Sequence, residues 1–198
     1  MTDTITQPLT GERIVFRKRA GDTGGTLLLG DIFVAPRGGI KPHIHPTMEE
    51  SFRVLHGPIT FRVDGVETTY GTGDEIVVPR GTVHEWWNPL ETEEVAAEMD
   101  FRPARDMETF FETWFGLATD GKFDERSRPA LLQGAVILHD FRREFALPGL
   151  EGKFLGVLAH ILAPIGRLRG YRSRYERYSG QAGAAAARKP VAIPVRPV

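Results

Sequence analysis

The stretch that decides the fold runs from residue 43 to residue 57 and reads HIHPTMEESFRVLHG. It opens with His43 and His45 on either side of a single isoleucine. Side chains alternate between the two faces of a strand, so the two imidazoles point the same way. Residues 46–48 can turn the chain and bring a carboxylate back beside them. The stretch therefore predicts two imidazoles and one carboxylate lying side by side.

Two neighbouring glutamates, Glu49 and Glu50, compete for that carboxylate position. Glu50 has the parity of Phe52 and Val54, which we expect to face inward, whereas Glu49 has the opposite parity. We therefore expect Glu50 to join the two histidines, and Glu49 is the alternative.

A second stretch, residues 73–88, reads GDEIVVPRGTVHEWWN and delivers His84 after a turn, a strand and a second turn. Three neutral imidazoles and one carboxylate suit a divalent transition metal such as Fe, Mn, Ni, Cu or Zn. Four protein ligands leave one or two coordination positions for water, substrate or dioxygen. The predicted metal ligands are thus His43, His45, Glu50 and His84. The alternative is that the three histidines are structural or vestigial.

Both stretches resemble the paired motifs of the cupin superfamily. The positions that match are His43, His45, Glu50 and Gly57 in the first motif and Gly73, Pro79, Gly81, His84 and Asn88 in the second. Arg37 stands where the first motif begins with glycine. Fifteen residues separate the two motifs, a spacing similar to that of small bacterial single-domain cupins. The resemblance covers about residues 25–102 and implies a single jelly-roll β-barrel, a double-stranded β-helix, with the metal inside.

The resemblance leaves the reaction open, because one site of this kind supports many chemistries. The first hypothesis is a metal-dependent dioxygenase, an oxidoreductase in which Glu50 is both a ligand and the catalytic proton acceptor. The second is a non-oxidative isomerase, epimerase or lyase whose metal polarises a carbonyl. The third is a non-catalytic module that binds a small ligand. We expect Phe52, Val54, Phe61 and Trp86 to line a cavity for a small, partly aromatic or apolar molecule.

The chain divides into three zones. Residues 12–102 contain short apolar runs separated by turn residues, which is typical of a mainly β barrel. The predicted strands cover residues 14–16, 26–34, 52–55, 59–63, 67–70, 75–78, 84–87 and 94–101. Residues 104–178 are expected to form a helical extension that packs on the barrel. Residues 179–198 are rich in Ala, Pro and Gly and are expected to form a disordered tail.

Three helices are predicted in the extension. An apolar stripe of helical period runs from Met107 to Phe115, with Asp106 as a cap and Gly121 as the end. A second helix is expected to begin near Ser127 and to include Phe145. A third is expected from Phe154, and Pro164 should kink or end it.

The charge is distributed unevenly, although the net charge is −1. Residues 1–141 carry 14 Lys and Arg against 23 Asp and Glu, whereas residues 142–198 carry 11 against 3. The acidic barrel argues against a nucleic-acid partner. The basic segment leaves contact of residues 154–178 with a membrane surface open. We favour packing of this segment on the barrel or on a second copy, and we expect a homodimer.

The sequence contains no cysteine, which excludes disulfides and thiolate ligands and fits a reducing compartment. No apolar run follows the N-terminus as a signal peptide would require. The longest apolar run, residues 154–165, would span roughly 18 Å as a helix, which is short of a bilayer core of about 30 Å. We therefore expect no transmembrane span and a cytoplasmic protein.

Overall fold

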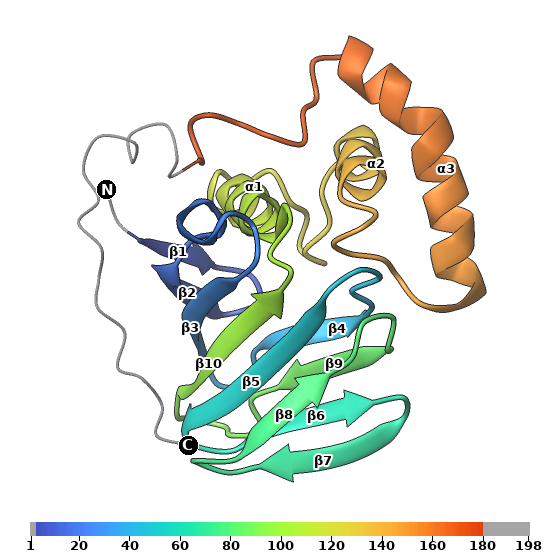
Figure 1. The fold of residues 1–198 in the computed structure, drawn as a ribbon. Coiled ribbons are helices and arrows are strands. Elements are labelled where there is room, and N and C mark those ends of the chain that lie inside the picture. The colour runs from blue at the N-terminus through green and yellow to red at the C-terminus, as the bar shows by residue number, and fades with distance from the viewer. Residues whose placement is uncertain (1–2, 180–198) are drawn as a thin grey trace.

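The computed structural model describes residues 3–179, and over these residues the strands form two sheets that face each other (Figure 1). The larger sheet contains, in spatial order, β1 (Thr4–Gln7), β2 (Glu12–Lys18), β3 (Leu28–Val34), β10 (Val95–Arg102), β5 (Glu49–His56) and β8 (Glu75–Val78). The smaller sheet contains β4 (Gly39–His43), β9 (His84–Trp87), β6 (Ile59–Val63) and β7 (Val66–Tyr70). Neighbouring strands in both sheets are antiparallel. The predicted jelly-roll barrel is confirmed.

Alternation of side chains builds the core between the sheets. Along β5, Glu50, Phe52 and Val54 are buried, whereas Glu49 is exposed. The same alternation runs along β3, where every second residue is buried. Burial of these apolar faces is the main favourable contribution to folding of a two-sheet protein. The parity that the sequence predicts for β5 is therefore present.

Two turn positions have a backbone that suits glycine. Gly57 has a φ of 71°, and a Cβ atom there would lie 2.7 Å from Cγ1 of Val95, so no larger residue fits. Arg37, which replaces the leading glycine of the first motif, has a φ of 59°. A non-glycine residue can adopt this left-handed conformation at a modest cost. The turn is thus kept although the glycine is missing.

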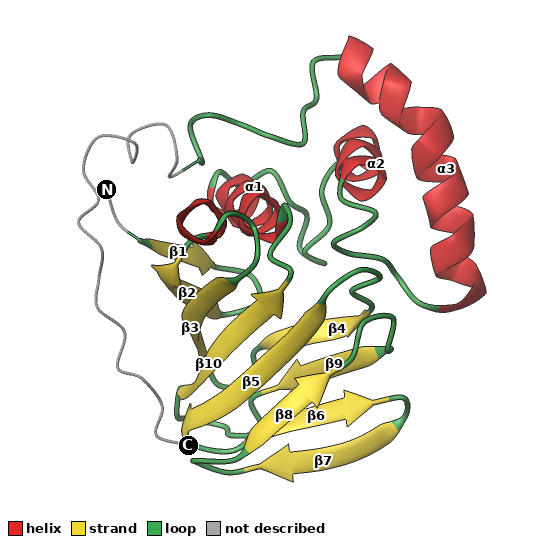
Figure 2. Ribbon diagram, viewed as in Figure 1, coloured by secondary structure: helices red, strands yellow, loops and turns green. Residues whose placement is uncertain are grey.

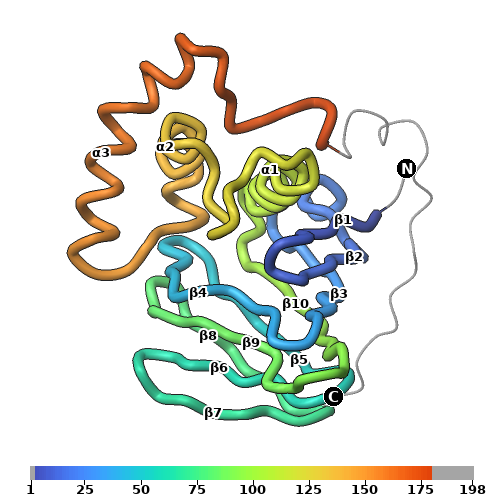
Figure 3. Tube along the Cα trace, turned by 180° about the vertical axis from the view of Figure 1, so that it is seen from behind, coloured from blue at the N-terminus to red at the C-terminus, as the bar shows by residue number. Residues whose placement is uncertain are grey.

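Three α-helices follow the barrel and lie on one side of the two sheets (Figure 2). They are α1 (Met107–Thr119), α2 (Leu131–Asp140) and α3 (Gly149–Leu168), and a short 3-10 helix, η1 (Ala20–Thr23), precedes β3. The view from behind agrees that α1 lies next to the barrel, α2 beside it and α3 outermost (Figure 3). Phe111 of α1 packs on Phe101 of β10, with ring centroids 5.7 Å apart.

A buried ion cluster fixes α1 to the barrel. The Arg19 guanidinium, just before η1, lies 2.5 Å from Glu108 and 2.9 Å from Glu112 on α1. The backbone amide of Ala20 also donates to Glu108, at 2.8 Å. Removing one partner of such a cluster would leave a buried charge uncompensated, which is strongly destabilising.

The second helix is shorter than the sequence predicts. It begins at Leu131 and not near Ser127, because Ser127 has a φ of 58° and Pro129 bridges to Phe123. It ends at Asp140, so Phe145 lies beyond it. The residues that follow Asp140 instead contact the barrel, as described below.

The third helix is longer than predicted. It begins at Gly149, and Pro164 lies inside it without ending it. No helix in the described part of the chain combines the length and the apolar character needed to cross a bilayer. The tail predicted for residues 179–198 lies outside the described residues, except for Ser179.

Candidate metal centre

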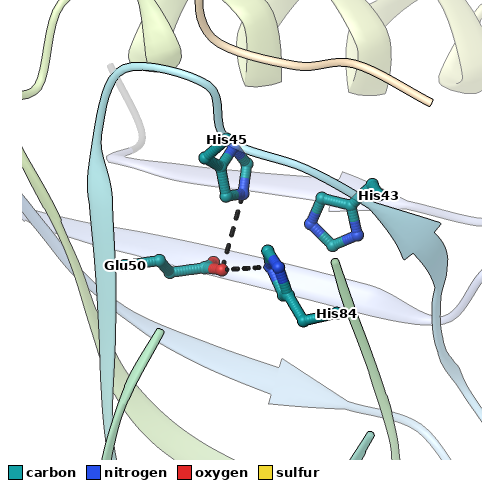
Figure 4. Close-up of side chains that lie close together, drawn as sticks. All are labelled: His43, His45, Glu50 and His84. Carbon is teal, nitrogen blue, oxygen red and sulfur yellow. Dashed lines mark hydrogen bonds and ion pairs between the residues drawn. The ribbon is translucent and has the colours of Figure 1, made fainter. Parts of the chain in front are cut away.

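Four side chains from the two sheets converge inside the barrel (Figure 4). His43 ends β4, His45 follows it, Glu50 lies at the start of β5 and His84 begins β9. Each is at most 3% exposed. Their candidate ligand atoms all lie within 4.8 Å of one another, so the four predicted ligands are brought together.

Strand pairing explains why these residues meet. His43 and His84 are directly opposite each other in the antiparallel pair β4–β9. Glu50 belongs to the other sheet, where it pairs with Val78 on one side and Phe101 on the other. The turn at residues 46–48 carries the chain from the small sheet to the large one. The cluster therefore bridges the two sheets.

The three imidazoles are oriented by backbone carbonyl groups. The Nδ1 atom of His43 lies 2.9 Å from the oxygen of Lys41, and that of His84 lies 3.0 Å from the oxygen of Thr82. The Nδ1 atom of His45 lies 2.6 Å from the oxygen of Glu144. When Nδ1–H donates to a carbonyl, the Nε2 lone pair is directed away from it and is available to a metal.

The inward-facing atoms are suited to an ion. The Nε2 atom of His45 is buried and has no hydrogen-bond partner within the described chain. It lies 3.4 Å from Oε2 of Glu50, and the Nε2 atom of His84 lies 2.9 Å from that same oxygen. Imidazole nitrogens around one carboxylate are donors that suit divalent transition metals. The cluster could therefore hold such an ion.

Burial and mutual charge set the protonation of the cluster. Burial lowers the pKa of His43 well below its usual range, and the neighbouring His45 and His84 lower it further. Burial alone would raise the pKa of Glu50, but the attraction of His45 and His84 outweighs burial and lowers it. Burial opposes the charge on His84, but its hydrogen bond to Glu50 raises the His84 pKa overall. Glu50 is thus ionised and His43 neutral, the forms that bind metal, whereas the raised pKa of His84 favours its protonated form, which must lose a proton to bind a metal.

The segment after α2 supports the centre from outside, and sequence reasoning missed it. Ile44 and Ala146 exchange two backbone hydrogen bonds of 2.9 Å. The hydroxyl of Thr47 donates to the carbonyl oxygen of Arg143, at 2.8 Å. The ring of Phe145 stacks on His43, with centroids 5.4 Å apart and planes at 17°. The helical extension therefore contacts the end of β4 and the loop after it, which carry His43 and His45.

A cavity of about 480 Å³ adjoins the cluster. His43, His45 and Glu50 form part of its wall, together with Trp86 of β9. The rest of the wall is largely apolar and includes Phe110 of α1, Leu138 of α2 and Leu158 of α3. The cavity thus lies between the barrel and the helices. Its position beside the candidate ligands makes it the place where a small molecule would meet a bound ion.

One of the four residues predicted to line a cavity, Trp86, lies in the wall of this one. Its buried Nε1–H has no hydrogen-bond partner within the described chain. Phe52, Val54 and Phe61 are buried in the barrel core. The Phe52 ring lies 4.9 Å from that of Phe61 and 5.8 Å from that of Trp86. Phe52 and Phe61 thus pack next to Trp86.

Glu12 is a lining residue that sequence reasoning missed. It is 6% exposed, and it accepts a hydrogen bond from the hydroxyl of Thr10. Burial raises the pKa of Glu12 from 4.5 to about 7, although the Thr10 hydrogen bond lowers it in part. Strand alternation could have predicted that Glu12 is buried, because it shares the inward face of β2 with Ile14 and Phe16.

The other histidines lie away from the centre. His56 is exposed at the end of β5. His139 of α2 and His160 of α3 face each other, with ring centroids 4.8 Å apart, and His139 contacts Asp140 at 2.9 Å. Within the described chain they do not join a group of three or more metal-ligating side chains.

Comparison with known proteins finds partial likenesses. Residues 31–98 match the family model described as the cupin domain, and no curated protein matches the chain. The cupin domain of Schizosaccharomyces pombe Cnp3 is 15% identical, with a TM-score of 0.42, over 46% of this chain and 64% of that chain. A predicted oxalate decarboxylase from Thermotoga maritima is 16% identical, with a TM-score of 0.46, over 52% and 92%. An RmlC-like cupin from Shewanella frigidimarina is 20% identical, with a TM-score of 0.45, over 54% and 88%.

Proposed function

Because the chain belongs to the cupin superfamily, we propose that it is a metal-dependent dioxygenase that acts on a small, partly aromatic or apolar molecule. The observation that carries this proposal is a cluster of four buried candidate ligands, three of which, His43, His45 and Glu50, lie in the wall of a largely apolar cavity. A metal ion beside an apolar cavity is the arrangement expected where an apolar substrate must be brought to a reactive centre.

The proposed metal ligands are His43, His45, Glu50 and His84. A divalent transition metal bound there would supply Lewis-acid chemistry and, if redox-active, activation of dioxygen. The backbone carbonyl oxygens on the three Nδ1 atoms keep the Nε2 atoms directed inward. Preorganised ligands of this kind avoid the cost of ordering them when the ion binds.

Glu50 has a second proposed role, as the catalytic proton acceptor. It is 3% exposed and forms part of the cavity wall. An ionised carboxylate at the cavity wall can accept a proton from a bound substrate.

The cavity supports the proposed class of substrate. Its wall is apolar apart from a few polar groups, so an apolar molecule gains from leaving water there. The buried Nε1–H of Trp86 has no partner within the described chain and can donate to an oxygen of the substrate. Satisfying a buried donor is worth about 1–3 kcal/mol, which would favour molecules that carry an acceptor. We therefore propose Trp86 as the lining residue that orients the substrate.

The test combines metal analysis with dioxygen uptake. The protein, purified without a histidine tag, is expected to contain a transition metal and to consume dioxygen with some members of a panel of small aromatic and apolar compounds. Turnover without dioxygen uptake would contradict the dioxygenase assignment and indicate a non-oxidative isomerase, epimerase or lyase. Tight binding of a compound without turnover would instead indicate a binding module. Protein that does not bind transition metals in equilibrium dialysis would overturn the metal site itself.

A further inference from the structure

Helix α3 carries a continuous apolar stripe on its outer face. Six large apolar side chains that are 45–88% exposed form it: Leu150, Phe154, Val157, Ile161, Ile165 and Leu168. They recur every three or four residues, so they share one face of the helix. A contiguous exposed apolar surface of this kind marks an interaction site on a soluble protein.

The opposite face of α3 is already occupied. Ala159, Ala163 and Gly166 are buried on it. A Cβ atom on Gly166 would lie 2.7 Å from Cγ2 of Val136, so α3 and α2 approach each other closely at this point. In both views α3 is the outermost helix (Figures 1 and 3). The stripe therefore faces away from the rest of the described chain, and its partner must come from outside it.

We propose that the stripe is a dimer interface, covered by the same stripe of a second copy with the two α3 helices antiparallel about a twofold axis. The spacing of the stripe is nearly the same in both directions along the helix, with its midpoint near residue 159. An antiparallel pair therefore sets Leu150 against the partner's Leu168 and Val157 against the partner's Ile161. A twofold interface requires such a self-complementary surface.

Charges at the two ends of α3 select the antiparallel orientation. Glu151 and Arg169 are exposed and 18 residues apart, which is five full turns, so they lie on the same side of the helix. An antiparallel pair places Glu151 beside the partner's Arg169, and the twofold axis repeats this pair. A parallel arrangement would place both Glu151 side chains at one end of the pair and both Arg169 side chains at the other, so these pairs of opposite charge could not form.

Three of the basic residues near and after the end of the stripe are paired within the chain. Arg167 pairs with Asp140. Arg174 lies 2.7 Å from Asp106, and Arg177 lies 3.0 Å from Asp120. Attraction of a helix to a membrane surface depends on basic side chains that are available to anionic lipids. These pairs reduce that attraction, and the stripe is thus better suited to a second protein copy than to a membrane.

The first test measures the mass of the full chain by sedimentation equilibrium. The wild-type protein is expected to be a dimer. Val157→Glu should raise the dimer dissociation constant about 100-fold or more, because each interface would bury two unpaired carboxylates. Gly156→Glu is the matched control, because Gly156 is exposed, lies off the stripe and has open space around its Cβ position. This control should stay dimeric, and circular dichroism should show both variants folded.

The second test exchanges the charges at the helix ends. Glu151→Arg and Arg169→Glu should each weaken the dimer about tenfold, and the double variant should restore wild-type affinity. Failure of the double variant to restore affinity would overturn the antiparallel pairing. A wild-type protein that is monomeric at millimolar concentration would overturn the interface. Monomers that bind phosphatidylserine vesicles and lose this binding in Val157→Glu would assign the stripe to a membrane surface.

Discussion

The Nε2 atom of His84 lies 2.9 Å from Oε2 of Glu50, although the two residues are 34 positions apart and belong to different sheets. This contact joins the two histidine-bearing stretches of the sequence into one cluster. Each side chain is held by its own strand, at the start of β9 and of β5. The cluster therefore depends on the packing of one sheet against the other.

His84→Ala should abolish stable metal binding. The substitution removes one proposed ligand and leaves Glu50 with His45 as its remaining imidazole contact. Loss of an outer-shell partner costs roughly 10- to 100-fold in metal affinity, so loss of a ligand should cost more. Competition with a chelator of known affinity measures the change. His139→Ala, on α2, is the control and should bind as the wild type does, and an unchanged affinity in His84→Ala would contradict the ligand set.

Glu50→Gln and Glu49→Gln separate the two neighbouring glutamates. Glu50 is 3% exposed and contacts two histidines, whereas Glu49 is exposed on the other face of β5. Glu50→Gln removes the negative charge among the imidazoles and should weaken metal affinity by at least about tenfold. Glu49→Gln should leave it within about twofold, since an exposed charge there is screened by water. The opposite ranking would assign the ligand role to Glu49.

Strand parity explains why the clustering of three of these side chains, those of His43, Glu50 and His84, could be predicted from the sequence. His43, Glu50 and His84 lie on or at the ends of short strands, where alternation alone decides the inward side. The first motif has glycine at the position of Arg37. The Arg37 backbone adopts a left-handed conformation without it, so the missing glycine does not prevent the turn. The inward direction of these side chains therefore follows from the residues of each short segment alone.

The support from the helical extension could not be predicted in the same way. The contacts of Glu144, Phe145 and Ala146 with the histidine-bearing loop join residues about 100 positions apart, such as His45 and Glu144. The helical period of the apolar residues continues through this segment. It therefore predicts that the second helix extends as far as Phe145. Pairing with Ile44 supplies the alternative backbone hydrogen bonds, and tertiary contacts override a weak local preference.

Glu12→Gln should remove a pH dependence of stability. Burial raises the Glu12 pKa from 4.5 to about 7. Between these two pH values, Glu12 keeps its proton in the folded state but has lost it in the unfolded state. The free energy of unfolding should therefore fall as pH rises from about 4.5 to about 7, by about 3 kcal/mol from this group. Glutamine is neutral throughout and can still accept from Thr10. Urea unfolding at a series of pH values measures the difference between the two proteins.

The test depends on which of the two proteins has the larger free energy of unfolding at high pH. The variant should equal the wild type at low pH and be the more stable protein above about pH 7, where wild-type Glu12 is ionised in its buried position. Glu94→Gln, which changes an exposed glutamate, is the matched control and should show no such crossover. A variant that is less stable than the wild type at pH 8 would mean that Glu12 is held ionised by a favourable contact.

Leu158→Trp should fill the cavity from the inner face of α3. Leu158 lines the cavity, and an indole in place of its isobutyl group would occupy space that an apolar molecule would otherwise take. Binding of a small aromatic compound such as 2-naphthol, followed by fluorescence, should weaken about tenfold or more. Extra volume in a fully packed core costs about 1–3 kcal/mol of stability. A cavity of about 480 Å³ can accept the indole, so the loss of stability should be smaller.

Gly156→Trp is the control, because Gly156 is exposed and lies two residues away from Leu158 on the same helix. It should bind 2-naphthol as the wild type does. A Leu158→Trp protein that binds normally, or one that is destabilised by the full amount, would show that this space is not open between the barrel and the helices.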